Sequence, residues 1–599
     1  MEPVIRVNLI IGSAKRILGM LAKSKRVIIL LAAAVLVVSL NAQMHAQTLK
    51  HVPHGDPVYR FLDRAYARGW ILFLPTTRPF TEQRVHTLLS EVMFEFMTSP
   101  EKFLPRDIEE LKSHMSRIEG NRFSLFSIGD DNFSADLNIA PNLGFNMALD
   151  TPRDTATTLG ADLVVDFTLA DRLYLGLRAD QHLVLETGRN SPHRKFHSPH
   201  YADWNMFTFN LSRGTEWWNE NQLRSEGDTE LSIRMNQLNQ MTIDLNLATF
   251  SFGKNSLSWG PSQFSNNILS HTSKPYEYFL LDLPFGNRIS FTWMTGFLRD
   301  RMPLRAEIDG RKLITAHKLE FQITRWLMFS IFEAVVYAPR FELAYLNPFA
   351  LYYISGITTG DYDNKLGGFG FVFRFAPVVV YWSVYFDDWN FGELFNPRFY
   401  NNQLITTLGI RHYDLIPGLT ITAEFTYLTH WMYTHPLRED GISRNYTHFG
   451  SHLGHVLGPN SYMIYLDFRY DHSLRLTYGL SFWLTQSGFG SINANARDGM
   501  GWDIKGIYSG GPRNVNYRFL DFGKREFNLE TNIDFTLYAE YRIPHHGVRL
   551  FAALSTQFTH NTGGHRDWNR DMDDRRFIDE NRGSNWRHFL TLAARWQAF

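Results

Sequence analysis

A polar block near the middle of the chain combines an aromatic ring with several hydrogen-bonding side chains. Trp259 is preceded by Lys254, Asn255 and Ser258 and is followed by Gly260. Sites for small polar ligands join an aromatic surface to a few fixed polar groups, so this block could bind a sugar stacked on the indole. The alternative is a structural turn that needs the backbone freedom of Gly260.

Two further groups of aromatic and acidic residues are candidates for the same chemistry. Asp387, Asp388 and Trp389 end a predicted strand, and Trp217 and Trp218 lie beside acidic residues. The carboxylates could bind sugar hydroxyls, or a cation that bridges an acidic polysaccharide. Alternatively, Asp387 belongs to an ion pair inside the protein and Trp389 lies at a membrane interface. The Trp217–Trp218 pair fits either a sugar platform or an interfacial anchor.

Oxygen atoms that could bind calcium occur in one short segment. Asp361, Asp363 and Asn364 offer such ligands at a spacing loosely like that of a calcium-binding loop. The later glutamate of an EF-hand is missing, which favours a simple solvated turn. We therefore predict no cofactor, with calcium as the alternative that these three side chains leave open.

Histidines and one glutamate are the remaining candidates. His448, His452 and His455 would share one face if they were helical, but the glycines among them argue against a helix and hence against a metal site. Glu333 lies within an apolar strand, where we expect it to point into a lumen and to pair with an arginine. A proton-linked role for this buried carboxyl group is the alternative.

Enzyme signatures are absent from the sequence. It contains no G-x-S-x-G elbow, no H-E-x-x-H motif and no phosphate-binding glycine loop. We therefore predict a protein without catalytic activity. A hydrolase whose Ser, His and Asp come from separate strands would leave no local signature, so it stays an alternative.

The composition excludes several further classes of protein. The 599 residues carry 60 basic and 60 acidic side chains, which argues against the basic surface of a nucleic-acid-binding protein. The chain has no cysteine, which excludes disulfide scaffolds, thiolate zinc sites and thiol catalysis. The absence of cysteine also suits a protein that crosses an oxidising compartment before it folds.

The first 46 residues have the organisation of a secretory signal peptide. Three basic residues precede the apolar run 27–40, and small residues follow at Ala42 and Ala46. The run is shorter than the about 20 residues that a membrane-spanning helix needs. We predict cleavage near one of these alanines, with an uncleaved anchor as the alternative.

Residues 47–125 predict a small helical domain. Asp56 and Gly69 are typical of the start and the end of a first helix, and Thr81 can cap a second. Apolar residues at helical spacing predict a third helix over Ile108–Ile118. We expect the three helices to dock against the rest of the chain, because so small a core is marginally stable alone.

Residues 126–599 predict an all-β transmembrane barrel of about 18 antiparallel strands. Apolar and polar residues alternate over about ten positions, for example in 241–247, 419–427 and 533–541. A soluble β-sandwich also alternates, but its strands are usually only about 5–6 residues long. Short turns alternate with long connections, as in outer-membrane barrels. Between residues 213 and 311 the sequence does not show which connections lie outside.

Several short blocks follow one another in a specific order along the mature chain. They are P-T-T-R-P-F-T-E-Q-R-V at Pro75–Val85, S-F-G-K-N-S-L-S-W-G-P-S at Ser251–Ser262, N-I-L-S-H-T-S-K-P at Asn267–Pro275, F-E-A-V-V-Y at Phe332–Tyr337, A-Y-L-N-P-F at Ala344–Phe349, D-Y-D-N-K-L-G-G at Asp361–Gly368, Y-W-S-V-Y-F-D-D-W at Tyr381–Trp389 and L-G-H-V-L-G-P-N at Leu453–Asn460. In this order they resemble the Wzi-type capsule-assembly family of outer-membrane proteins.

The resemblance implies a barrel whose periplasmic end carries a helical bundle, and a lectin-like role in holding capsular polysaccharide on the cell surface. It implies no catalysis. The expected location is the bacterial outer membrane, with the helical domain in the periplasm. The expected partners are surface polysaccharide, outer-membrane lipid and the barrel-insertion machinery, and no nucleic acid. An open lumen would favour a porin or substrate-specific channel instead, whereas a helical plug and long inward loops would favour the polysaccharide binder.

Overall fold

The computed structural model describes residues 49–118, 126–130, 133–149, 155–170, 172–187, 221–226, 229–299, 311–337, 340, 342–360, 363–387, 403–429, 432–435, 444–448, 451–459, 461–488, 529–543, 548–560 and 584–596. The predicted signal peptide lies outside these residues. Within the described parts of the chain, no helix is both long enough and apolar enough to cross a membrane.

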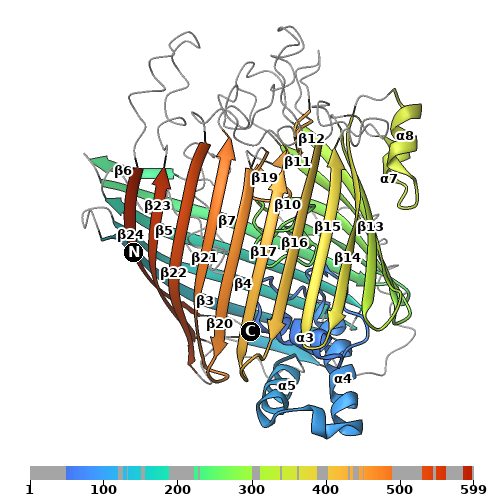
Figure 1. Ribbon diagram of the computed structural model, residues 1–599, viewed down its shortest axis with the longest axis horizontal. Coiled ribbons are helices and arrows are strands. Elements are labelled where there is room, and N and C mark those ends of the chain that lie inside the picture. The colour runs from blue at the N-terminus through green and yellow to red at the C-terminus, as the bar shows by residue number, and fades with distance from the viewer. Residues whose placement is uncertain are drawn as a thin grey trace, which may run out of the picture.

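Eighteen antiparallel strands form a closed barrel, as predicted (Figure 1). In order around the ring they are β3 (Phe133–Ala148), β4 (Thr155–Leu169), β5 (Leu173–Thr187), β7 (Thr229–Asp244), β8 (Thr249–Asn255), β10 (Tyr276–Phe285), β11 (Ile289–Arg299), β12 (Arg311–Gln322), β13 (Leu327–Tyr337), β14 (Asn364–Phe375), β15 (Val378–Asp387), β16 (Gln403–Tyr413), β17 (Leu419–Leu428), β20 (Ser461–Asp471), β21 (Leu476–Gly488), β22 (Leu529–Ile543), β23 (Val548–His560) and β24 (Ser584–Trp596). The ring closes where β24 pairs with β3. Two further strands, β2 (Phe126–Asp130) and β6 (Asn221–Glu226), pair with β3 and β7.

The connections alternate in length around the ring. Strands joined at the end that carries the helices have short turns, among them 323–326, 376–377 and 414–418. Strands joined at the opposite end have longer connections, among them 338–363, 429–460 and 489–528. The turns 245–248 and 286–288 belong to the helix end and the segment 256–275 to the opposite end. The strand order therefore shows at which end of the barrel each of these connections between residues 213 and 311 lies, which the sequence alone did not show.

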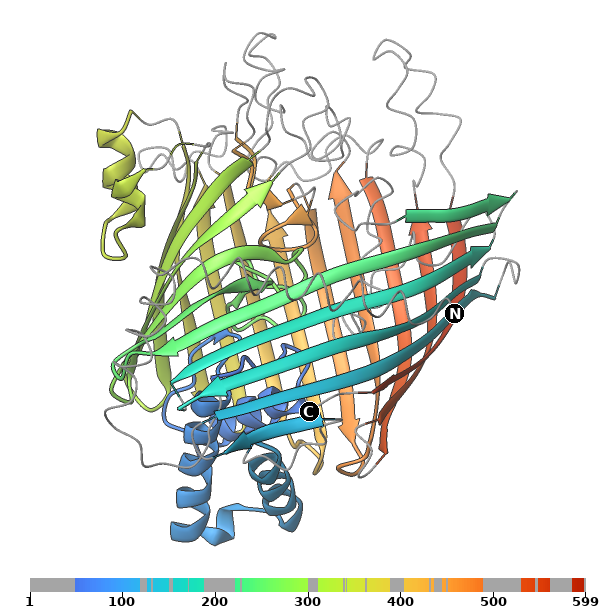
Figure 2. The same cartoon turned by 180° about the vertical axis from the view of Figure 1, so that it is seen from behind.

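Side chains alternate between the lumen and the outside of the barrel. On β17, Thr422, Glu424 and Thr426 are buried in the lumen, whereas Phe425 between them is exposed on the outside. Other strands expose large apolar side chains in the same way, including Ile331, Leu408, Ile410, Leu480, Leu537 and Leu554. An apolar outer surface around polar inner positions is typical of a strand between lipid and a wet lumen. The strongly tilted back wall is seen in Figure 2.

All three predicted N-terminal helices form, and the predicted start and end of the first and the predicted start of the second are confirmed, whereas the third begins three residues before Ile108. They are α3 (Pro57–Arg68), α4 (Glu82–Thr98) and α5 (Pro105–Ile118), with the 3-10 turn η1 (Pro100–Lys102) between the last two. The Asp56 side chain accepts from Val58 N–H, and Thr81 accepts from Arg84 N–H, so both N-caps form. Gly69 ends α3 in the left-handed conformation, with φ of 82°.

The helices α3, α4 and α5, which we call the helical head, dock against the strands of the barrel wall. This docking was predicted because the core between three short helices is small. The buried cluster of the head continues into side chains of the wall, namely Met328, Val372, Val379, Tyr381 and Tyr413. Arg374 of β14 donates to the backbone carbonyls of Tyr66 and Ile71, at 3.1 and 2.7 Å. In Figure 1, α3 lies at the mouth of the barrel, and α4 and α5 project beyond the strand ends.

The stability of the head should depend on pH. Burial opposes ionisation of Asp56, but the Arg117 guanidinium at 2.7 Å outweighs it and holds the pKa of that carboxyl below its ordinary 3.8. Burial lowers the pKa of His114 below its ordinary 6.5. Both groups bind protons more readily in the unfolded chain, so their contribution is complete above about pH 6.5 and falls as the pH drops. We expect hydrogen exchange in α3 and α5, corrected for intrinsic rates, to be faster at about pH 4 than at about pH 7. Unchanged protection would contradict this ion-pair account.

Candidate functional site

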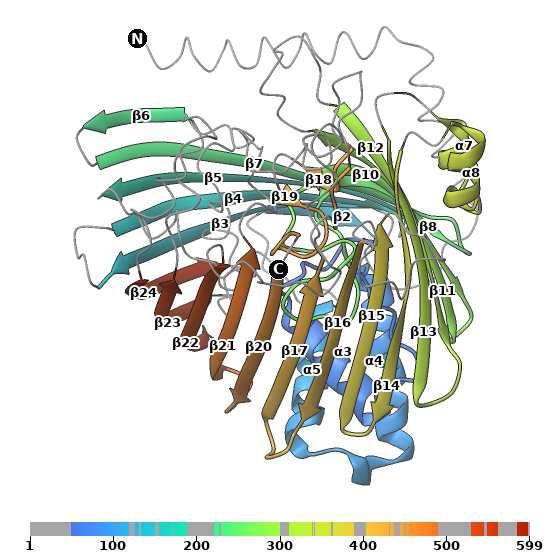
Figure 3. The ribbon, with the colours of Figure 1, turned by 45° about the horizontal axis from the view of Figure 1, so that its top comes forward.

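Three segments of the chain lie inside the ring of strands. We call residues 69–81, which follow α3, the N-terminal segment, and residues 256–275 the inward loop. The described residues 432–435, 444–448 and 451–459 are called the outer loop. The short strand β1 (Thr77–Arg78) of the first pairs with β9 (Ser258–Trp259) of the second. The outer loop contains the hairpin of β18 (Thr447–His448) and β19 (Ser451–His452), which Figure 3 shows within the barrel outline. Together the three segments form a plug.

Backbone hydrogen bonds join the three parts of the plug to one another. Gly260 N–H donates to the Thr76 carbonyl at 2.9 Å, and Ser270 N–H donates to the Leu453 carbonyl at 2.8 Å. Gly260 has a φ of 147°, and a Cβ atom there would lie 2.4 Å from Asn266 Oδ1. A glycine is therefore needed at this close approach, which agrees with the structural alternative for this block.

Glu424 of β17 fixes the inward loop to the wall. Its carboxylate accepts hydrogen bonds from the backbone N–H groups of Gln263 at 2.5 Å and Phe264 at 3.2 Å. It also accepts from the hydroxyl groups of Ser262 at 3.0 Å and of Tyr381. Three of these four donors belong to the loop, so one buried carboxylate holds this part of the loop in a single position.

Other wall carboxylates hold the remaining two segments of the plug. Glu320 of β12 accepts from Thr76 N–H at 3.1 Å and from the Thr76 hydroxyl at 2.7 Å, and it pairs with Lys318 at 3.0 Å. Asp387 of β15 accepts from Tyr433 N–H at 3.0 Å. Each segment of the plug is thus bonded to a buried acidic side chain of the wall.

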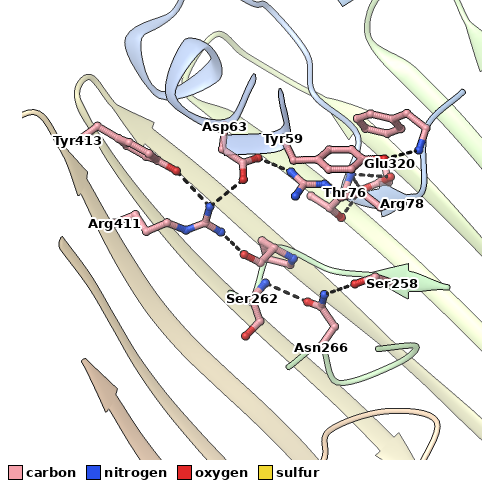
Figure 4. Close-up of polar contacts among 12 residues, drawn as sticks. Tyr59, Asp63, Thr76, Arg78, Ser258, Ser262, Asn266, Glu320, Arg411 and Tyr413 are labelled. Carbon is pink, nitrogen blue, oxygen red and sulfur yellow. Dashed lines mark hydrogen bonds and ion pairs between the residues drawn. The ribbon is translucent and has the colours of Figure 1, made fainter. Parts of the chain in front are cut away.

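An arginine connects the head, the plug and the wall (Figure 4). The Arg411 guanidinium of β16 lies 3.3 Å from Asp63 of α3 and donates to the Tyr413 hydroxyl at 3.1 Å. It also donates to the Pro261 carbonyl of the inward loop. Asp63 is shared with Arg78 of the N-terminal segment. Because one cation bonds three elements, the head and the inward loop cannot move independently without breaking buried polar contacts.

Two small cavities remain around this arginine. One of about 110 Å³ lies between the N-terminal segment, the inward loop and the wall, and one of about 60 Å³ lies towards the head. Both are lined by Arg60, Asp63, Arg411 and Arg469. Sites for small molecules usually measure about 300–1,000 Å³, so these spaces suit water molecules rather than a passing polymer.

The structure places Trp259 in the core of the plug. Its side chain is 1% exposed and meets the Phe332 ring edge-on, with 6.2 Å between ring centroids. The indole therefore has no exposed face on which a sugar could stack, contrary to the first interpretation of this block. Lys254 and Asn255 lie half-buried at the end of β8, where Asn255 accepts from Ser256 N–H at 2.8 Å.

The other predicted sugar contacts fall into two groups. Asp387 is fully buried in the lumen, as the alternative interpretation has it, and its carboxylate accepts a hydrogen bond from Tyr433 N–H of the outer loop. The remaining candidates lie outside the described residues: Asp388, Trp389, Trp217 and Trp218.

The predicted calcium ligands have other partners. Asp363 lies 2.5 Å from Arg340 and 3.7 Å from Arg444, so its negative charge is already compensated by two cations. Asn364 donates to the Arg444 carbonyl at 3.1 Å, and Asp361 lies outside the described residues. Among the residues that the structure describes, no group of three or more His, Asp or Glu side chains could hold a metal ion.

The three histidines do not share a helical face. His448 and His452 belong to the β18–β19 hairpin, as the surrounding glycines suggested. His448 Nδ1 accepts from Arg299 N–H at 3.0 Å, and the His455 ring stacks on Phe264 with 6.1 Å between centroids. They pack the outer loop against the wall and the inward loop.

The prediction for Glu333 is wrong. On β13 the neighbouring Phe332 and Ala334 pack against the plug, so Glu333 points out of the barrel. It accepts from the backbone N–H groups of Tyr352 and Tyr353 and lies 3.3 Å from His317, with no arginine partner among the described residues. Sequence reasoning also missed Glu320, Glu424 and Arg411, whose only signal was their place on the polar side of alternating strands.

Comparison with known proteins supports the fold. No protein-family model and no curated protein sequence matches the chain. Among solved structures, it is similar to Wzi, an outer-membrane protein involved in group 1 capsule assembly in Escherichia coli and a carbohydrate-binding β-barrel. The TM-score is 0.53 at 12% identity, covering 92% of this chain and 100% of that one. OprD from Pseudomonas aeruginosa matches more weakly, with a TM-score of 0.39 at 10% identity, covering 79% and 95%. The chain therefore has the fold of a Wzi-like outer-membrane barrel, as its resemblance in sequence predicted.

Proposed function

We propose that the chain is a non-enzymatic outer-membrane barrel that binds surface or capsular polysaccharide and assists its attachment or assembly. In this proposal the helical head lies in the periplasm and the long connections face outward. The plug is the observation that carries the proposal. A channel needs a continuous water-filled path, whereas three bonded segments occupy this lumen.

The buried contacts of the plug make it a fixed part of the fold. Glu424 and Glu320 accept hydrogen bonds from backbone and side-chain donors of two different segments, and Arg411 bonds to a third carboxylate and a carbonyl. Breaking these bonds without replacement would leave buried polar groups unpaired, which is costly. A fixed plug favours binding at the outer surface over transport through the lumen.

The topology supports one outer face for sugar contacts. The connections 188–220 and 388–402 both join strands at the end opposite to the helices. We therefore retain Trp217, Trp218, Asp388 and Trp389, which belong to these connections, as the proposed sugar contacts. Many weak contacts of this kind along one polymer would add up to firm retention, because each bound unit raises the local concentration of the next.

Binding of polysaccharide purified from the protein's own host, compared with unrelated glycans, tests this function. Folded protein in proteoliposomes should bind the host polysaccharide saturably. Trp389→Ala should weaken that binding by about two- to tenfold, because one aromatic contact is lost. Removal of calcium with a chelator should leave binding unchanged, since we propose no cofactor.

Trp326→Ala is the matched control. Trp326 is an exposed tryptophan in a turn at the helix end of the barrel, so its loss should not affect sugar binding. Absence of binding by a folded barrel would refute the proposal. Entry of small sugars into the liposomes would then support a channel, and release of shorter glycan fragments would support a hydrolase.

A further inference from the structure

Two short helices lie against the outside of the barrel. They are α7 (Leu343–Leu346) and α8 (Tyr352–Thr358), and Figure 3 shows them beyond the ring of strands, next to β13. We call residues 343–358 the outer flap. Tyr345 and Tyr352 of the flap share a buried cluster with wall side chains, namely Phe291, Trp293, Val335 and Tyr337.

The wall beneath the outer flap carries polar groups on its outer surface. His317 of β12 and Glu333 of β13 are cross-strand partners that both point outward. At roughly 3.3 Å per residue, the seven residues from Trp326 to Glu333 cover about 23 Å of a strand that in such barrels tilts by about 40°, or about 18 Å of height. Aromatic residues flank the apolar band of such barrels, which is about 25 Å tall, so taking Trp326 as its edge at the helix end places Glu333 at the depth of hydrocarbon. A bare carboxylate there would be unfavourable.

The outer flap covers these groups and satisfies them. Glu333 accepts from the N–H groups of Tyr352 at 2.8 Å and Tyr353 at 2.5 Å, at the start of α8. The His317 Nδ1 atom lies 3.1 Å from the Pro348 carbonyl. Trp293 Nε1 donates to the Tyr352 hydroxyl at 3.0 Å. The polar patch of the wall is therefore paired with the inner face of the flap.

The exposed surface of the same flap is largely apolar. Six large side chains of the flap are between 55% and 71% exposed: Leu343, Phe349, Leu351, Tyr353, Ile354 and Ile357. This surface continues the apolar band of the wall, where Ile331 of β13 is also exposed. An exposed apolar patch of this size on a soluble surface would be unusual.

A basic side chain lies in the contact between the flap and the wall. The Lys365 side chain of β14 lies against Gly356 of α8, where an added Cβ atom would come within 2.2 Å of Lys365 Cε. The Lys365 ammonium lies 5.5 Å from the centre of the Tyr353 ring. The flap thus places a cation beside an amphipathic ring, a combination that suits the boundary between acyl chains and anionic headgroups.

We propose that the outer flap is a lipid-facing cover whose apolar side is embedded in the acyl chains of the outer leaflet. It replaces a polar patch of the wall by an apolar surface and so completes the lipid-facing band. The continuity of its exposed side chains with those of the wall identifies lipid as the occupant. This inference does not depend on the proposed binding of polysaccharide.

Site-directed spin labelling tests the proposal, because the chain has no cysteine of its own. Ile354→Cys and Ile357→Cys would each be labelled with a nitroxide in vesicles of phosphatidylcholine and phosphatidylglycerol. Oxygen concentrates in hydrocarbon, whereas a nickel chelate stays in water. The ratio of oxygen to nickel collisions should match that of Ile331→Cys on the bare wall. It should be several-fold above that of Glu101→Cys, an exposed position in the head.

Two results would overturn the proposal. If both flap labels collide with nickel as freely as the label at Glu101, the flap lies in water. If their protection from nickel is lost when the protein is diluted in lipid, a second copy of the chain covers the flap instead. Because both label sites are exposed, the substitutions should leave the fold intact, and retained heat-modifiable mobility in gel electrophoresis would verify this.

Discussion

Removing the inward loop should convert the closed barrel into an ion-conducting pore. Asn255 and Tyr276 are register partners on β8 and β10, so a short Gly-Ser turn can replace residues 257–272 without disturbing the wall. The deletion removes the pairing of β9 with β1 and all donors that Glu424 receives from the loop. In planar bilayers we expect a conductance at least about tenfold above that of the intact protein, which should stay near background.

A substitution within the loop provides the control. Ser262→Ala loses one hydroxyl contact with Glu424 but retains the loop, so this variant should remain closed. If the intact protein conducts ions as well as the deletion does, the plug does not close the lumen. That result would also remove the main support for a binding function over a channel.

Glu424→Ala should strongly destabilise the barrel. The substitution leaves the N–H groups of Gln263 and Phe264 and the Tyr381 hydroxyl without their buried acceptor. A buried polar group without a partner costs about 1–3 kcal/mol, so we expect a loss of roughly 3 kcal/mol in the free energy of unfolding. Denaturant titration of tryptophan fluorescence in lipid vesicles would measure it.

Glu424→Gln is the matched variant for this measurement. It keeps the shape of the side chain and one acceptor oxygen, so the loss in unfolding free energy should be clearly smaller than that of the alanine variant. If Glu424→Ala unfolds at the same denaturant concentration as the unaltered protein, the carboxylate does not fix the inward loop.

Much of the fold could be predicted because the signals are local. The N-cap at Asp56, the glycine stop at Gly69 and the cap at Thr81 each act within one helical turn, and all three form. The alternation of side chains along β17 likewise depends only on the geometry of one strand. Counting the segments that show this alternation gives the number of strands, and the residues between those segments give the lengths of the connections.

Glu333 shows where such local reasoning fails. Its strand, L-M-F-S-I-F-E-A-V-V-Y, is apolar on both faces, because one face packs against the plug and part of the other packs against the outer flap. A polar lumen is what normally distinguishes the two faces of a barrel strand. Where a plug makes the lumen apolar, the sequence of the strand no longer shows which side a residue faces.

The site itself depends on contacts between distant parts of the chain. Trp259 was interpreted as a free platform because its neighbours in sequence are polar, yet its side chain is buried in one apolar cluster with Phe332 and Leu269. Arg411 and Asp63 are separated by 348 positions in the sequence. Glu424 likewise lies 161 positions from Gln263, the loop residue that it holds. No spacing rule connects residues whose proximity arises only when the barrel closes around the plug.

The most direct test of the proposed function is equilibrium binding of host polysaccharide to the unaltered protein, in vesicles whose ionic conductance is recorded in parallel. We predict saturable binding at background conductance, because the glycan is held by the outer face of a closed barrel. Conductance without binding would contradict this function and would identify the chain as a channel.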